Sequence, residues 1–266
     1  MKIIEAIRTL ETVAPAAYQE PYDNAGLLTG QPDWECTGIL CTLDATEAVI
    51  IEAKSRGCNL VVAHHPIIFS GLKKINGKNY VERTIIAAIK NDIAIYAIHT
   101  NLDNVLKGVN DRIADQLGLI NRRILVPKDE LSNDNQSVGS GLMGELPEPL
   151  NETGFLQMLV TSFGLSVVRH TPLLGKNLKK VAICGGSGSF LIGKAILAGA
   201  DIYISADIKY HEFFDADSRI VVADIGHWES EQYTTDLLID ILQAKFPTFA
   251  VLKSGIKTNP VNYFMG

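Results

Sequence analysis

The chain has 266 residues, of which 47% are hydrophobic and 20% are charged, and its formal net charge is −6. This balance is typical of a globular protein that buries a full core, and it argues against intrinsic disorder. The acidic charge argues against nucleic acid as a partner, because sequence-independent phosphate binding needs a cationic surface, although a few local donors could still bind a nucleotide.

The N-terminal segment, 1–15, has apolar residues at helical spacing, interrupted by Glu5, Arg8 and Glu11. The sequence shows no cationic leader followed by an apolar stretch. It also has no uncharged run that approaches the roughly 20 residues of a membrane span. We therefore expect a cytoplasmic protein with no membrane partner.

The four cysteines have no CxxC spacing, and each lies in or near an apolar run. They are Cys36, Cys41, Cys58 and Cys184. We expect buried, reduced thiols, with a disulfide framework or a thiolate zinc site as the alternative.

The first third of the chain contains a strand–helix–strand pattern. The apolar run 38–41 predicts a short buried strand, and 60–63 predicts the next one. The segment between them, 46–56, is expected to be a helix with Asp44 as a plausible N-cap. Gly57 is expected to end that helix.

The same plan recurs later in the chain. Strands are expected at 181–184 and 202–204, and a helix is expected at 190–198, between the turn 185–189 and Gly199. The two patterns align without a gap. Strand–helix–strand units of this length favour right-handed parallel crossovers.

A further strand is expected in each half, at 93–98 and 220–223. We therefore predict an α/β protein with two similar lobes whose sheets are mostly parallel. The first lobe is expected at 1–125 and the second at 141–266. The segment 126–140 is rich in Asp, Asn, Ser, Gly and Pro and is expected to be a connecting loop.

A histidine pair marks the end of the second predicted strand. His64 and His65 follow the apolar run 60–63, and Pro66 prevents the strand from continuing normally. The C-terminal edge of a parallel sheet is where α/β proteins place ligands. Because neighbouring side chains on a strand diverge, two ions with one ring each fit this pair better than one shared ion. The alternative is a pair of ordinary loop histidines.

Two further strand ends carry a histidine followed four residues later by a carboxylate. The pairs are His99 with Asp103 and His227 with Glu231. If a helix begins at each strand end, residues four apart lie on one face and can reach a common ion. Together with the histidine pair, these repeats predict a metal site. We expect two ions in the cleft between the lobes.

The ligand types indicate the chemistry of this site. Imidazole and carboxylate ligands without thiolate suit Zn, Mn, Fe, Co or Ni, and the sequence does not choose among them. Five or six protein ligands spread over two ions leave positions for water, as in catalytic sites. Two close ions can polarise a substrate and acidify a bridging water, with Glu231 or Asp103 as the bridging ligand. His99 is alternatively a hydrogen-bond donor beside the ligands or a proton carrier.

Other segments are weaker candidates for substrate binding. The backbone N–H groups around Gly186 and Ser187 could bind an anion, although such glycine turns are more often plain tight turns. Lys209 and His211 occupy the position in the second half that matches the histidine pair. They could bind a phosphate or act as an acid, or they could lie at a solvated helix start.

Six stretches together resemble a known family, the GTP cyclohydrolase 1 type 2 homologues, also called Nif-three-like proteins. The stretches are YDNAGL at 22–27, AHHP at 63–66, HTNLD at 99–103, CGGSG at 184–188, DIKYH at 207–211 and GHWESE at 226–231. They occur in the family's order and span nearly the whole chain.

The resemblance implies a dimetal site whose ligands are His64, His65, Asp103, His227 and Glu231. It also implies two related α/β lobes and a ring-shaped homohexamer. The family name implies hydrolytic opening of the guanine ring of GTP, which suits a site that activates water. The sequence has no distinct motif for guanine or triphosphate. A non-enzymatic assembly that stores, delivers or senses metal, or that acts as a partner scaffold, is therefore an alternative.

Overall fold

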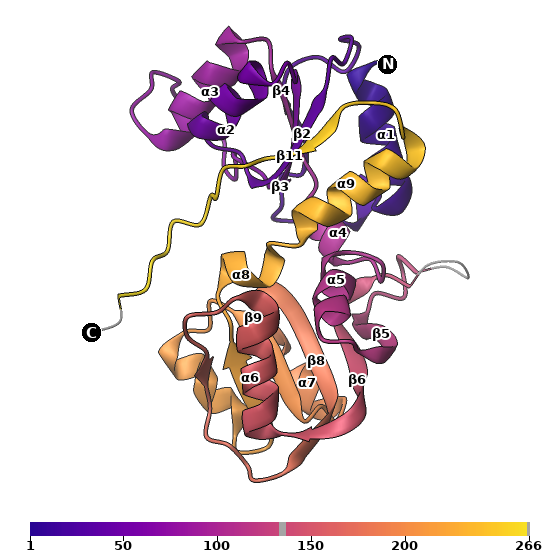
Figure 1. Ribbon diagram of the computed structural model, residues 1–266, viewed down its shortest axis with the longest axis vertical. Coiled ribbons are helices and arrows are strands. Elements are labelled where there is room, and N and C mark those ends of the chain that lie inside the picture. The colour runs from indigo at the N-terminus through magenta and orange to yellow at the C-terminus, as the bar shows by residue number, and fades with distance from the viewer. Residues whose placement is uncertain (133–136, 265–266) are drawn as a thin grey trace. The chain divides into compact units, whose positions relative to one another are not determined.

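The computed structural model describes residues 1–132 and 137–264, and it contains two compact α/β units (Figure 1). The first unit comprises Met1–Leu102 and Thr234–Asn262, and the second comprises Asp103–Tyr233 and the chain from Tyr263 onward. Each unit contains its own sheet and helices. The prediction of an α/β protein with two lobes is confirmed.

The first unit is built on a sheet with the strand order β1-β4-β3-β2-β11. Its strands are β1 (Gly26–Thr29), β2 (Ile39–Asp44), β3 (Leu60–His65), β4 (Ala94–Ala97) and β11 (Val251–Lys253). The four strands β11, β2, β3 and β4 run parallel, and β1 pairs antiparallel with β4.

Helices cover both faces of this sheet (Figure 1). The helices α1 (Ile3–Val13) and α9 (Thr234–Lys245) pack together on one side, and α2 (Glu47–Ser55) and α3 (Tyr80–Lys90) pack together on the other. Two short helical elements follow in the chain: η1 (Ala16–Tyr18) after α1 and α4 (Thr100–Asp103) after β4. Buried aliphatic residues from β2, β3 and β4 meet α2 and α3 in one core cluster.

The start of α2 differs from the sequence prediction in a way that matters for the site. The N-cap is Thr46, whose side chain accepts a hydrogen bond from the N–H of Val49. The strand β2 continues to Asp44, so this residue ends a strand and is not the cap of the helix. Gly57 follows α2 with a φ of 71°, as expected for a residue that ends a helix.

The second unit is built on a sheet with the order β5-β6-β8-β9-β10-β7. Its strands are β5 (Ile120–Pro127), β6 (Gly139–Asn151), β7 (Arg169–His170), β8 (Asn177–Ser187), β9 (Ile202–Ala206) and β10 (Val221–Asp224). Its helices are α5 (Val109–Gln116), α6 (Glu152–Phe163), η2 (Ser189–Leu191), α7 (Ile192–Leu197), η3 (Tyr210–Ala216) and α8 (His227–Glu231). The parallel centre is β8, β9 and β10, as predicted.

The rest of this sheet departs from the expected parallel order. The strand pairs β5–β6, β6–β8 and β7–β10 are antiparallel. The expected connecting loop, 126–140, instead contributes to the hairpin of β5 and β6, although residues 133–136 of it lie outside the described part. Glycine explains the close pairing: a Cβ on Gly139 would lie 2.1 Å from the carbonyl oxygen of Val126.

The compact units therefore divide the chain at other positions than the expected lobes, 1–125 and 141–266. Helix α5 and strand β5 belong to the second unit, because β5 pairs with β6. Helix α9 and strand β11 belong to the first unit, because β11 pairs with β2. Every helix in the described ranges is too short or too polar to span a membrane.

Candidate metal centre

The first unit gathers three histidines at one edge of its sheet. His64 and His65 are the last residues of β3, and His99 follows the neighbouring parallel strand β4. The ring centroids lie 4.9 Å apart for His64 and His65, and 5.3 and 5.4 Å from these rings to His99. One ring nitrogen from each residue lies within 4.8 Å of the others. The adjacent carboxyl ends of parallel strands explain this convergence.

Each of these rings is held through its Nδ1 atom. His64 Nδ1 lies 2.8 Å from the carbonyl oxygen of Ile98, His65 Nδ1 lies 2.7 Å from Asp44 Oδ1, and His99 Nδ1 lies 2.8 Å from Asp23 Oδ1. A carbonyl or an ionised carboxylate can only accept, so Nδ1 carries the proton and donates it in each case. In a neutral ring with this tautomer the lone pair is on Nε2. Metal-binding histidines are commonly oriented in this way.

The carboxylates that orient two of these rings were not identified from the sequence. Asp23 also accepts hydrogen bonds from the backbone N–H of Thr100 at 3.0 Å and from its hydroxyl. Burial raises the pKa of Asp23, but the bonds from His99 and Thr100 outweigh this effect and lower the pKa to about 2. Asp44 additionally accepts a hydrogen bond from the hydroxyl of Thr258. Two features of the sequence could have indicated them. Asp23 lies in the motif at 22–27, and Asp44 lies at the end of the strand before α2.

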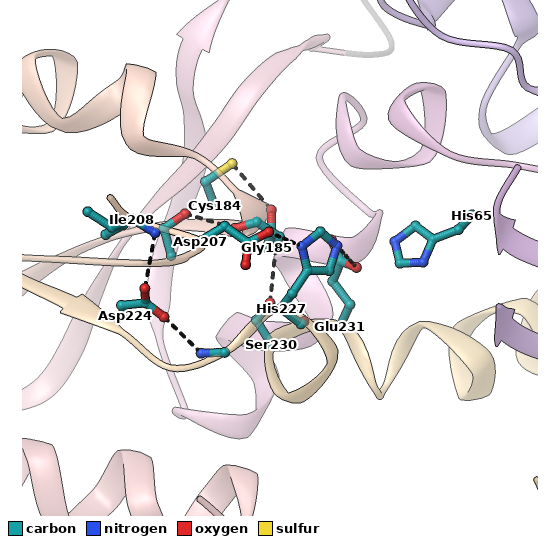
Figure 2. Close-up of polar contacts among 12 residues, drawn as sticks. His65, Cys184, Gly185, Asp207, Ile208, Asp224, His227, Ser230 and Glu231 are labelled. Carbon is teal, nitrogen blue, oxygen red and sulfur yellow. Dashed lines mark hydrogen bonds and ion pairs between the residues drawn. The ribbon is translucent and has the colours of Figure 1, made fainter. Parts of the chain in front are cut away.

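The second unit places His227 between two carboxylates (Figure 2). His227 and Glu231 are the first and last residues of α8, and His227 Nε2 lies 3.2 Å from Glu231 Oε2. On the other side of the ring, Nδ1 lies 2.7 Å from Asp207 Oδ2. Burial lowers the pKa of His227, but the hydrogen bonds and negative charges of Asp207 and Glu231 outweigh it and raise the pKa to about 11. The surroundings of Nε2 therefore favour positive charge.

Asp224 fixes the two segments that carry these residues. Its Oδ2 accepts hydrogen bonds from the N–H of Ile208 at 3.0 Å and from Arg169 at 3.0 Å, and its Oδ1 accepts one from the N–H of Gly226 at 3.1 Å. Ile208 follows Asp207, and Gly226 precedes His227. One buried carboxylate thus ties the end of β9 to the start of α8 (Figure 2).

The carboxylates of Asp103 and Glu231 lie close enough to Cys184 to affect its pKa. The pKa of this thiol is raised to about 12, first by burial and then by the negative charges of Asp103 and Glu231. Asp103 and Glu231 are therefore both within electrostatic reach of this one thiol. This thiol is therefore protonated at neutral pH. Cys36, Cys41, Cys58 and Cys184 are all free thiols.

Gly186 brings the strand β8 close to Glu231. Its φ is 63°, and a Cβ on it would lie 2.4 Å from Glu231 Oε1 and 3.2 Å from His227 Cε1. Its N–H donates to Ser230 Oγ at 3.0 Å, and the N–H of Gly185 donates to Asn110 Oδ1 at 2.9 Å. These two N–H groups therefore donate to partners within the protein. The strand β8 also continues to Ser187, which pairs with Ala206.

The structure places Lys209 and His211 at the start of η3, after β9. Lys209 is exposed and is the N-cap of η3, and the His211 ring lies 5.1 Å from the Tyr210 ring and 6.3 Å from the Phe214 ring. From this segment it is Asp207 that contacts His227. The sequence singled out this segment but did not identify Asp207 as the residue that contacts His227.

Both sets of residues have the donor types that divalent ions require. The first unit supplies three oriented imidazoles, and the second supplies an imidazole and the carboxylates of Asp103 and Glu231. Imidazole and carboxylate suit the first-row metals from Mn to Zn. The residues therefore fit metal ions of this group.

Comparison with known proteins gives a consistent result. Residues 1–260 match the family model described as Duf34/NIF3 (NGG1p interacting factor 3). A Clostridium perfringens protein named GTP cyclohydrolase 1 type 2 homolog is 36% identical over 232 residues, which is 87% of each chain. A Lactococcus lactis protein of the same name is 34% identical and covers 98% of each chain. A crystal structure of a Bacillus cereus protein related to NIF3 has a TM-score of 0.91 and 26% identity, with 99% of each chain covered.

Proposed function

Because this chain belongs to the Duf34/NIF3 family, we propose that it is a metal-dependent hydrolase of a nucleotide or a related heterocycle. The proposed cofactor is a pair of divalent ions chosen from Zn, Mn, Fe, Co and Ni. The proposed protein ligands are His64, His65, Asp103, His227 and Glu231.

One observation carries the proposal furthest: His227 is held between two carboxylates. Asp207 orients the ring through Nδ1, and the Nε2 side faces the buried carboxylate of Glu231. A purely structural helix start has no need of a buried glutamate next to an oriented imidazole. A bound cation is favoured by this combination, with a negatively charged ligand beside Nε2 and a carboxylate that accepts the hydrogen bond from Nδ1.

When bound, the two ions would supply Lewis acidity and a water of lowered pKa. The chain's own residues perform the other tasks. Asp44 and Asp207 keep His65 and His227 in the tautomer that binds through Nε2. We assign substrate contacts to Lys209 and Ser187. His211 is the candidate proton donor, because a ring exposed on η3 is accessible to a substrate.

GTP is the first substrate to test, because the curated relatives are named GTP cyclohydrolase 1 type 2 homolog. Purified protein loaded with each metal should open the guanine ring of GTP or hydrolyse another heterocycle in a panel read by mass spectrometry. His64→Ala and Glu231→Gln should abolish turnover, whereas His170→Ala, a change at an exposed residue of β7, should retain it.

Two results would contradict this proposal. Turnover that is unchanged in the His64→Ala and Glu231→Gln variants would come from a contaminant or from another site. Stoichiometric metal without turnover on any substrate would favour the alternative of a non-enzymatic assembly that stores, delivers or senses metal.

The homohexamer implied by the family is a further part of the proposal. Native mass spectrometry of the full chain should give a mass six times that of the 29.0 kDa monomer. A monomer or dimer across the accessible concentration range would contradict it.

A further inference from the structure

We propose that the loop between β3 and α3 binds a nucleotide, with the base stacked on Phe69 and the phosphates bound by Lys73 and Lys74. This loop, 66–79, lies in the first unit (Figure 1). The inference rests on the proposed nucleotide substrate and names residues that would select it. It adds to the contacts assigned to Lys209 and Ser187, which lie in the second unit.

Phe69 is exposed although the residues next to it belong to the core. Ile67 is buried, and Ile68 and Leu72 pack against the core cluster of the first unit. Phe69 itself is 58% exposed. Single exposed apolar residues are common on protein surfaces, so the significance of Phe69 depends on its surroundings.

Phe69 lies at the edge of the sheet where the histidines gather. The centroid of its ring is 5.9 Å from that of His99, and the two ring planes are inclined by 82°. His99 in turn lies next to His64 and His65. An edge-to-face contact with one neighbouring ring leaves a face of Phe69 open, in agreement with its exposure. A planar heterocycle stacked on that face would lie close to the proposed reaction site.

Hydrogen bonds fix the backbone of the loop on both sides of these residues. The side-chain amide of Asn24 donates to the carbonyl oxygen of Ile68 at 2.6 Å. Further along the chain, the carboxylate of Glu82 accepts hydrogen bonds from the N–H groups of Asn76 and Lys78 at 3.1 and 2.9 Å. A backbone that is already fixed loses little conformational entropy when a ligand binds, which favours affinity.

The loop is positively charged, whereas the whole chain has a formal net charge of −6. It contains Lys73, Lys74 and Lys78 and has no aspartate or glutamate. Lys73 and Lys74 are exposed, and neither forms an ion pair with a carboxylate in the described parts of the chain. Lysine ammonium groups bind phosphate oxygens as point charges, so these two side chains favour a phosphorylated ligand.

The spacing of these residues suits a nucleotide. Lys73 follows Phe69 by four residues, and four residues of fully extended chain span at most about 14 Å. A ligand that contacts both residues therefore combines an aromatic plane with a phosphate a short distance away. Single-stranded nucleic acid has the same chemistry, but the negative charge of the chain disfavours a polyanion. Because stacking tolerates different bases, Phe69 would favour nucleotides as a class and not guanine alone.

The test measures the two parts of the ligand separately. The full chain is freed of metal with a chelator, and its affinity for GTP, guanosine and inorganic triphosphate is measured by isothermal titration calorimetry. Phe69→Leu removes the aromatic face, so it should weaken binding of GTP and guanosine by about 5- to 100-fold and leave triphosphate unchanged. Lys73→Ala combined with Lys74→Ala should weaken binding of GTP and triphosphate by about 10-fold and leave guanosine unchanged.

Two exposed residues of the same unit are the matched controls. Ile89 is also 58% exposed and lies near the end of α3, and Lys54 lies near the end of α2. Both helices end just before a parallel strand begins, whereas Phe69 follows the end of such a strand. Ile89→Ala and Lys54→Ala should leave all three affinities unchanged.

Three results of the titrations would overturn the inference. The first is unchanged affinity for guanosine in Phe69→Leu, and the second is unchanged affinity for triphosphate in the double lysine variant. The third is absence of binding of all three probes by the unaltered chain. Binding of oligothymidylate that depends on Phe69, without binding of GTP, would replace the nucleotide by nucleic acid.

A second variant keeps the test valid if Phe69→Leu is unstable. Phe69→Trp keeps an aromatic plane, so it should bind GTP at least as tightly as the unaltered chain. Stacking should also quench the added indole fluorescence, measured against the signal of Trp34 and Trp228 in the unaltered chain. Saturation with GTP without such quenching would overturn the role of Phe69.

The outcomes distinguish this inference from the proposed hydrolase. Binding that follows these expectations, with no turnover by the metal-loaded chain, would support the nucleotide site and contradict the hydrolase. Turnover of GTP that is unaffected by Phe69→Leu and by the two lysine changes would overturn the inference and leave the hydrolase intact.

Discussion

Asp207 shows how a single side chain can orient a proposed metal ligand. It accepts the hydrogen bond from His227 Nδ1, and this bond together with those of Glu231 raises the pKa of His227. The residue was not identified from the sequence, because its role depends on a contact between the ends of β9 and β10. His64, His65, Asp103, His227 and Glu231 could be proposed as ligands from their positions at strand ends, but Asp23, Asp44 and Asp207 could not.

The first prediction concerns Asp207. Asp207→Asn removes the charge behind His227 but keeps the size of the side chain, so the ring is oriented less firmly and is a weaker base. Metal affinity should fall by about 10- to 100-fold. Isothermal titration calorimetry with the apo protein measures this change. Asp215→Asn, at an exposed position of η3, is the control, and equal affinities for the two variants would contradict the assigned role.

The second prediction concerns Gly186. Gly186→Ala should destabilise the protein by about 1–2 kcal/mol for the left-handed backbone, with an added cost from the contact at 2.4 Å with Glu231. Metal affinity should fall as well, because Glu231 has to move. Gly199→Ala has the same kind of backbone, with a φ of 73°, and no atom within 4 Å of the new Cβ. Urea unfolding of both variants separates the two effects, and equal losses would show that the contact with Glu231 is relieved without cost.

At the level of elements, apolar runs identify the central strands of both sheets. The runs 38–41, 60–63 and 202–204 correspond to β2, β3 and β9, because buried parallel strands are continuously apolar. Strand β6 was missed because glycine and proline lower strand propensity and suggested a loop. Its pairing with β8, seen in Leu142 opposite Ile183, depends on a distant segment.

The third prediction concerns the start of α3. Glu82 accepts hydrogen bonds from the backbone N–H groups of Asn76 and Lys78 at 3.1 and 2.9 Å, and these bonds lower its pKa. A carboxylate with a lowered folded-state pKa adds stability that is present above its unfolded pKa of about 4.5 and is lost as the pH falls through the folded value. Glu82→Gln should therefore reduce stability at pH 7 and flatten its loss between pH 5 and pH 3.

Denaturant unfolding across this pH range measures the effect. Glu148→Gln, at an exposed position of β6, provides the comparison. A pH profile for Glu82→Gln that follows that of the unaltered chain would show that the hydrogen bonds to Glu82 do not contribute to acid stability.

At the level of the whole molecule, the path of the chain between the two units could not be predicted from the sequence. The chain leaves the first unit after Leu102 and returns to it at Thr234. The C-terminal strand β11 then pairs with β2, near the other end of the sequence. A local sequence pattern cannot indicate a pairing between such distant segments. The two lobes could therefore be predicted, but their boundaries could not.

The fourth prediction concerns removal of metal from the whole protein. Ions that bind the folded chain and not the unfolded chain stabilise it, by about 4 kcal/mol for each site at a free concentration of 1,000 Kd. Chelation should lower Tm, and addition of metal should restore it. The combined His64→Ala and Glu231→Gln variant should show little of this shift. A chelator-independent Tm in the unaltered chain would contradict stoichiometric binding to the folded state.

The late return of the chain has a consequence for biosynthesis. Strands β2 and β3, with His64 and His65, leave the ribosome early, but α9 and β11 are translated only after the entire second unit. The second sheet comes from one continuous stretch and can close first, while the first sheet still lacks α9, which packs on β2 and β3. The nascent protein therefore carries exposed aliphatic surface through most of translation.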